Sequence, residues 1–133
     1  GPVQVRDIIS VLPFNNYLLV LELTGAQLKE ALEHPESIAG GVRFTYRNVE
    51  GRRLIEELAR RDGQRIEPAD KLKVVVNDFM YRGGDKYQLK GYDPEPEETA
   101  IDWREPVLRR LRAMQEQEKI LDVAADDRAR EVE

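Results

Sequence analysis

The chain has 133 residues, which fits one domain of common size with a hydrophobic core. Apolar residues make up 41% of it, which excludes general disorder, and the net charge of −5 excludes an overall positive field for nucleic acid. The absence of cysteine excludes disulfides and thiolate metal sites, and no apolar run reaches the length of a membrane span. Residues 1–4 lack the features of a signal peptide, so either the protein is not exported or these residues come from inside a longer chain.

The first third of the chain predicts a helix, a strand and a second helix. A short helix is expected over 5–12, where apolar side chains share one face and a following proline stops it. The apolar run 17–23 predicts a buried strand. Thr24 begins a helix over 25–33, because Gln27 three residues later completes the pattern of a capping box.

The only histidine, His34, lies at the C-terminal end of that second helix. A single histidine there usually supplies a favourable charge near the negative end of the helix dipole. We do not expect it to bind a metal ion, because no second histidine or carboxylate lies at ligand spacing.

The middle of the chain is rich in strand signals. Residues 42–46 alternate apolar and polar side chains, which predicts a half-buried strand. Residues 52–66 are ambiguous, because three apolar residues would share a helical face, whereas Asp62-Gly63 is a strong hairpin signal. We expect strand, turn, strand over this stretch.

Four features are expected in the last half. The valine-rich run 72–77 predicts an interior strand, and the acidic, proline-rich stretch 93–98 predicts a solvated loop. A final helix over 103–116 follows an aspartate cap, with apolar side chains on an inner face. The tail over 119–133 is expected to be frayed from residue 126.

Together these elements predict one mixed α+β domain over 1–133. We expect a central mixed sheet flanked by helices; its strands are 17–23, 42–46 and 72–77, and the helices are 25–33 and 103–116.

The stretch after the valine-rich strand carries the strongest functional signal. Phe79 precedes a double glycine, Gly83-Gly84, and Asp85 follows it directly. A flat apolar ring and a carboxylate at the end of a strand form a plausible grip for a ring that bears hydroxyls. The alternative is an ordinary loop with a core phenylalanine and a turn aspartate.

Catalytic machinery is missing from the sequence. One histidine and no cysteine exclude a Cys-His pair, and neither Ser10 nor Ser37 lies in a nucleophile-elbow motif. There is no phosphate-binding glycine loop, and no carboxylate cluster has the spacing of a metal cage. The residues therefore indicate a binding module and not a self-sufficient catalyst.

Four stretches in order resemble the C-terminal domain of 5′-nucleotidases, a family that includes the bacterial UDP-sugar hydrolases. The first stretch is Leu12–Asn16 with the strand that follows it and Thr24–Glu33. The other three are Val42–Tyr46, Asn77–Met80, and Gly83-Gly84-Asp85 together with Tyr87. The resemblance covers roughly residues 3–115.

This resemblance implies that the domain recognises the nucleoside part of a nucleotide or nucleoside. Phe79 would be one of two aromatics that sandwich the base, Asp85 would bind the ribose hydroxyls, and Gly83 and Gly84 would shape the turn. The domain itself would bind no cofactor. Two divalent metal ions are expected in a partner N-terminal metallophosphoesterase domain, where they activate water.

The chain departs from the family pattern in three places. Residues 36–41 lack the second stacking aromatic, so either one ring suffices or Tyr81 substitutes for it. Arg82 and Lys86 replace smaller residues, and they either add positive charge that favours anionic substrates or are simply solvated. The family's phosphate-gripping arginine segment would precede residue 1, so we expect this fragment alone to be inactive.

Several expectations follow from the family alone. Relatives vary in substrate, so UDP-sugars, cyclic nucleotides or sulfur substrates stay open, as does a binding or interaction domain that kept only the fold. A missing first helix would expose apolar surface and favour a homodimer of the fragment. The family also implies a periplasmic, secreted or cell-surface location, with no nucleic acid partner and no membrane span.

Overall fold

The computed structural model describes residues 2–117 and 128–133. The helices are α1 (Val5–Val11), α2 (Gly25–Leu32), α3 (Asp78–Tyr81), α4 (Leu89–Tyr92) and α5 (Glu105–Glu116), with a 3-10 turn η1 (Gly84–Lys86). The strands are β1 (Tyr17–Thr24), β2 (Val42–Val49), β3 (Arg52–Arg60), β4 (Lys71–Asn77), β5 (Glu97–Asp102) and β6 (Ala129–Glu131). This mixture of short helices and strands confirms the predicted fold class.

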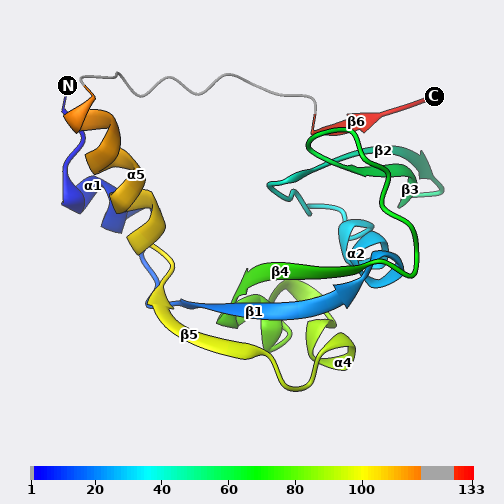
Figure 1. Cartoon of the computed structure of the whole chain (residues 1–133), viewed down its shortest axis with the longest axis horizontal. Coiled ribbons are helices and arrows are strands. Elements are labelled where there is room, and N and C mark those ends of the chain that lie inside the picture. The colour runs from blue at the N-terminus through cyan, green and yellow to red at the C-terminus, as the bar shows by residue number, and fades with distance from the viewer. Residues whose placement is uncertain (1, 118–127) are drawn as a thin grey trace.

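The strands form two small sheets and not the single central sheet that we expected (Figure 1). One sheet has the order β4-β1-β5 and the other has the order β3-β2-β6. The expected strand 42–46 lies in the second sheet because β2 turns back directly onto β3. Glu50 and Gly51 in this turn both have positive φ, 50° and 78°, which matches the twist that a tight hairpin needs. Since β6 pairs with the other edge of β2, neither edge of β2 is left to pair with a strand of the first sheet.

The first sheet holds the deepest part of the core. Leucines at alternate positions of β1 lie on one face of the sheet. Strand β1 pairs with β4 in an antiparallel register that places Leu19 opposite Val76 and Leu21 opposite Val74. Leu21 is completely buried. Leu89 of α4 joins this cluster, which fixes the short helices after β4 against the sheet.

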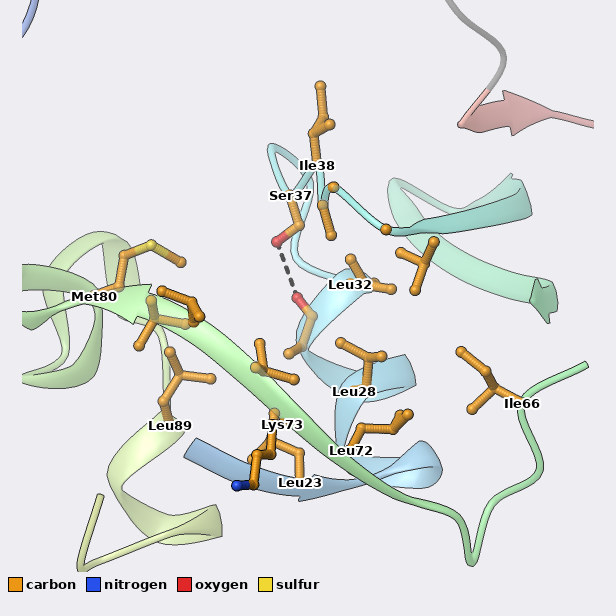
Figure 2. A pocket seen from close by; sticks show the side chains of 18 of the residues that line it. Leu23, Leu28, Leu32, Ser37, Ile38, Ile66, Leu72, Lys73, Met80 and Leu89 are labelled. Carbon is orange, nitrogen blue, oxygen red and sulfur yellow. Dashed lines mark hydrogen bonds between the residues drawn. The ribbon is translucent and has the colours of Figure 1, made fainter. Parts of the chain in front are cut away.

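An apolar groove of about 560 Å³ opens beside β4 (Figure 2). Leu28 and Leu32 of α2 line its middle, with Met80 towards one end and Ile66 towards the other. Ile38 also lines it and is 70% exposed.

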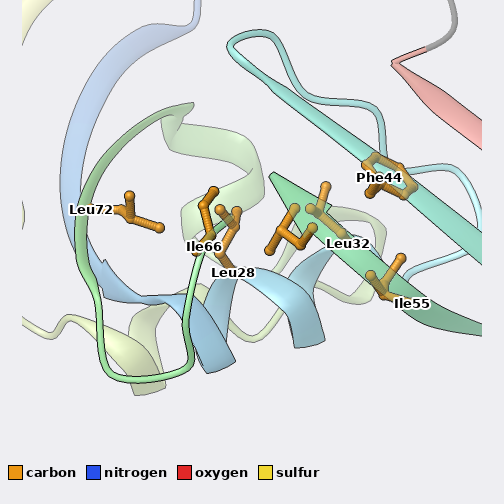
Figure 3. Close-up of a cluster of buried hydrophobic side chains, with 7 residues drawn as sticks. Leu28, Leu32, Phe44, Ile55, Ile66 and Leu72 are labelled. Atoms are coloured by element: carbon orange, nitrogen blue, oxygen red, sulfur yellow. The ribbon is translucent and has the colours of Figure 1, made fainter. Parts of the chain in front are cut away.

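Helix α2 joins the two sheets. Its N-terminus has the predicted capping box: the Gln27 amide donates to Thr24 Oγ1 at 3.2 Å, and the Thr24 amide donates to Gln27 Oε1 at 2.9 Å. Leu28 and Leu32 of α2 pack in a second core cluster (Figure 3). The other members of that cluster are Phe44, Ile55, Leu58, Ile66 and Leu72.

The ends of the chain differ most from expectation. Part of the stretch 93–98, which we expected to be a solvated loop, enters strand β5, because Glu97 and Glu98 pair with β1 while their side chains stay exposed. We expected the last residues to be frayed, but they are hydrogen-bonded to β2. The Phe44 amide donates to the Arg128 carbonyl and the Val132 amide donates to the Tyr46 carbonyl, both at 2.7 Å. The remainder of the expected tail, 119–127, lies outside the described residues.

Two further expectations need correction. The stretch 52–66 is a strand over β3, but its second half contributes only an isolated bridge between Ala59 and Arg65. Helix α5 begins at Glu105, and the inner face that its sequence predicts is only partly covered: Leu108, Leu111 and Met114 are half-buried, and no residue of the helix is fully buried. Within the described ranges, no helix is long and apolar enough to cross a bilayer.

Candidate functional site

The junction between β4 and α3 places the candidate site. Asn77 ends the strand and caps the helix, because its Oδ1 accepts a hydrogen bond from the Met80 amide at 2.8 Å. The chain therefore turns sharply at the end of the sheet. This turn brings Phe79 to the surface, where its side chain is 50% exposed.

Asp78 anchors this turn to the start of β1. Its Oδ1 accepts hydrogen bonds from Asn16 Nδ2 at 2.8 Å and from the Tyr17 amide at 3.1 Å. Burial alone would raise the pKa of the Asp78 carboxyl, but those hydrogen bonds and the nearby Arg82 guanidinium outweigh it, so the pKa lies below its ordinary value. The Asn-Asp pair of the sequence motif thus fixes the backbone on either side of the site.

The Phe79 ring is backed by Gly84. A β-carbon built on Gly84 would lie 2.4–2.5 Å from three atoms of the ring, so only glycine allows this approach. Gly83 has φ 96°, a conformation that favours glycine. The double glycine therefore both turns the chain and supports one side of an otherwise exposed ring.

Asp85 follows with an exposed side chain and a left-handed backbone at φ 55°. Its carbonyl oxygen accepts a hydrogen bond from His34 Nε2 at 2.6 Å. The His34 ring stacks on Tyr87 with centroids 4.2 Å apart and an angle of 20° between the planes. Sequence reasoning missed this contact, because it interpreted His34 as a charge at a helix end; the tertiary contact joins residues 51 positions apart.

Of the three other predicted site residues, two have side-chain contacts within the fold. The Tyr81 hydroxyl donates to the Asp93 carbonyl at 3.1 Å, and its ring packs against the core cluster around Leu89. Arg82 donates to the Tyr17 hydroxyl at 2.7 Å and lies 3.9 Å from Asp78, whereas Lys86 is exposed with φ 65°. These contacts favour structural roles for Tyr81 and Arg82, and their binding roles stay predictions.

Neither Phe79 nor Asp85 lines the apolar groove beside β4, although Tyr87 and Met80 do. The exposed Phe79 ring and Asp85 carboxylate therefore lie outside that groove. In the part of the chain that the structure describes, no three His, Asp or Glu side chains gather closely enough to hold a metal ion.

The model of the 5′-nucleotidase C-terminal domain family matches residues 1–91 of this chain. The trifunctional nucleotide phosphoesterase protein YfkN of Bacillus subtilis is 33% identical in an alignment 104 residues long, which covers 67% of this chain and 7% of YfkN. Cell wall protein Lmo0130 of Listeria monocytogenes is 31% identical in an alignment 88 residues long, which covers 59% of this chain and 11% of Lmo0130. The chain thus spans a small part of these relatives.

The solved structures give the same answer for the fold. The crystal structure of a 5′-nucleotidase precursor from Thermus thermophilus matches with a TM-score of 0.81 at 23% identity, over 99% of this chain and 28% of that one. At this identity the likeness concerns the fold alone. With the family model matching more than half of the sequence, the chain belongs to the 5′-nucleotidase C-terminal domain family.

Proposed function

We propose that this chain is the substrate-recognition domain of a metal-dependent 5′-nucleotidase-type phosphohydrolase. In this proposal Phe79 stacks against the base and Asp85 accepts hydrogen bonds from the ribose hydroxyls. The observation that carries the proposal is the half-exposed Phe79 ring, which is supported from behind by Gly84 and followed by an exposed carboxylate on a fixed turn.

The chemistry of the two groups suits a nucleoside. Every nucleobase has a flat π-face, and stacking on an aromatic side chain contributes about 1–3 kcal/mol. An ionised carboxylate only accepts hydrogen bonds, so Asp85 would select hydroxyl donors of a sugar. The positively charged side chains of Arg82 and Lys86 flank Asp85 in sequence and would favour anionic substrates.

The phosphate chemistry belongs to another part of the parent protein. Two divalent metal ions there would activate water and stabilise the leaving group, as two-metal sites do. We predict that the 133-residue chain alone releases no phosphate from nucleotides. The similarity to a cell wall protein supports a location at the cell surface.

Titration of the chain with adenosine and AMP by isothermal calorimetry tests the proposal. We expect Phe79→Leu and Asp85→Asn each to weaken adenosine binding about tenfold, since 1.4 kcal/mol corresponds to a factor of ten. The exposed Phe14 and Glu57 offer matched controls, Phe14→Leu and Glu57→Gln, which should bind like the wild type. Wild-type affinity in both site variants would overturn the proposal.

A second candidate is an interaction domain that kept the fold and lost nucleoside binding. The apolar groove beside β4, with Ile38 and Val75 both exposed, favours it. This reading predicts no heat with adenosine, UDP-sugars or cyclic nucleotides, together with concentration-dependent self-association in light scattering. The substitutions Ile38→Asp and Val75→Asp should then abolish the association.

A further inference from the structure

We infer that His34 is a positioning residue that fixes the Asp85 carboxylate for the ribose, acting through the backbone of Asp85. The inference rests on the proposed function, in which Asp85 binds the sugar hydroxyls. It assigns to the only histidine of the chain a role in substrate selection without contact with the substrate.

The contacts of His34 fix its tautomer. A carbonyl oxygen can only accept, so Nε2 must carry the proton that it donates to Asp85 at 2.6 Å. On the other side of the ring, the Glu36 amide donates towards Nδ1 over 3.4 Å, which requires a lone pair there. The neutral imidazole with its proton on Nε2 satisfies both partners, and it holds the Asp85 peptide group in one orientation.

Asp85 needs such support. Asp85 and Lys86 are consecutive non-glycine residues with positive φ, 55° and 65°, a conformation that persists only where surrounding contacts favour it. The turn is held a second time by Tyr87, whose ring stacks on the same imidazole. His34 therefore contacts the turn on both sides of Lys86.

The Tyr87 hydroxyl strengthens this attachment. Ser37 Oγ donates its single proton to the Ala31 carbonyl at 2.9 Å, so the Tyr87 hydroxyl is the donor in its 2.6 Å bond to Ser37 Oγ. Ser37 is buried. The candidate binding turn is thus attached to the C-terminal end of α2 by a ring stack and two hydrogen bonds.

Arg53 of the second sheet fixes His34 in turn. Its Nη1 donates to the carbonyls of Ser37 at 2.9 Å, His34 at 3.3 Å and Leu32 at 3.4 Å. Its guanidinium lies 4.5 Å from the centre of the Tyr46 ring, which orients it by a cation–π contact. The position of Asp85 is therefore set from the second sheet, through Arg53 and the 32–37 turn.

The test uses two substitutions that separate the hydrogen-bond donor from the ring. His34→Phe keeps a ring to stack on Tyr87 but cannot donate, whereas His34→Gln loses the ring but its amide can still donate to the Asp85 carbonyl. We expect His34→Phe to weaken adenosine binding about tenfold and to leave binding of 2′,3′-dideoxyadenosine unchanged, because the latter lacks the 2′- and 3′-hydroxyls that Asp85 would bind. His34→Gln should recover most of the adenosine affinity.

Two further measurements separate positioning from folding. In the Asp85→Asn background, His34→Phe should cause no additional loss of adenosine affinity. Hydrogen exchange of the Lys86 and Tyr87 amides, which close the turn onto Gly83 and Gly84, should be faster in His34→Phe than in His34→Gln.

The outcomes test the role of His34 separately from the role of Asp85. Equal weakening of adenosine and the dideoxy analogue by His34→Phe, or additive losses with Asp85→Asn, would assign His34 a general structural role and overturn the inference. If His34→Phe bound adenosine normally while Asp85→Asn bound it weakly, the inference would also be overturned, but the proposed function would stand. Normal adenosine binding in Asp85→Asn would overturn the role of Asp85 itself, and the inference with it.

Discussion

The Phe79 ring lies so close to Gly84 that a β-carbon on Gly84 would come within 2.4 Å of it. Gly84→Ala should therefore displace the ring from the turn. Because the ring is half exposed and can move outward, we expect a small loss of stability but a weakening of adenosine binding by about tenfold. Calorimetric titration of the variant measures it.

Gly40 provides the matched control for that substitution. Nothing lies within 4 Å of a β-carbon built there, so Gly40→Ala should retain wild-type affinity. Unchanged binding in Gly84→Ala would show that the ring does not need this support.

Gly25→Ala should destabilise the fold. The new β-carbon would lie 2.1 Å from the Glu67 carbonyl oxygen, and the backbone cannot yield easily because the Gly25 amide is bonded to the Asp70 carbonyl at 2.8 Å. Overpacking of this kind costs about 1–3 kcal/mol of unfolding free energy, measurable by urea denaturation. Gly91→Ala, in open space, is the control and should lose nothing.

Asp78 makes the free energy of unfolding depend on pH. Its pKa is lowered in the folded state, so its contribution is fully present above the unfolded value near 3.8 and is lost as the pH falls through the folded pKa. Asp78→Asn removes the charge that accepts from Asn16 and Tyr17 and should cost about 1–3 kcal/mol at pH 7.

The measurement for Asp78 is the denaturation midpoint between pH 7 and pH 2. The stability difference between the wild type and Asp78→Asn should shrink as the solution becomes acidic, while the exposed Glu57→Gln should follow the wild type. A difference that stayed constant over this range would contradict the assignment.

Leu21→Ala should cause the largest loss among these substitutions. Leu21 is completely buried on β1, the central strand of the first sheet, and removal of a buried leucine side chain typically costs about 2–5 kcal/mol, depending on how far the cavity collapses. Leu54→Ala on β3, where the side chain is 41% exposed, should lose less than about 1 kcal/mol. Equal losses would mean that the first sheet is not the main core.

Local patterns predicted the elements well where neighbours in sequence determine them. The capping box of Thr24 and Gln27 joins residues three positions apart, and it is present as expected. Helix α5 shows the limit of such patterns, because its apolar face predicts burial but its residues are at most half-buried. Periodicity reports which side of a helix could pack, and not whether a partner covers it.

Some features of the site could not be predicted because they join distant segments. The turn after Phe79 was recognisable from its double glycine, since the preference of glycine for positive φ is a property of the residue itself. The hydrogen bond from His34 to Asp85 was not recognisable, because nothing local to either residue indicates a contact across 51 positions.

The sequence alone determined the family, the mixed fold class and most strands and helices, because periodicity, caps and turn glycines act over a few residues. Only the tertiary structure decided that the strands divide into two sheets, that β6 pairs with β2, and that α2 presents His34 to the candidate binding turn. Those features depend on which edges and side chains meet once the chain is folded, and pairing between distant segments leaves no periodic signal in the segments themselves.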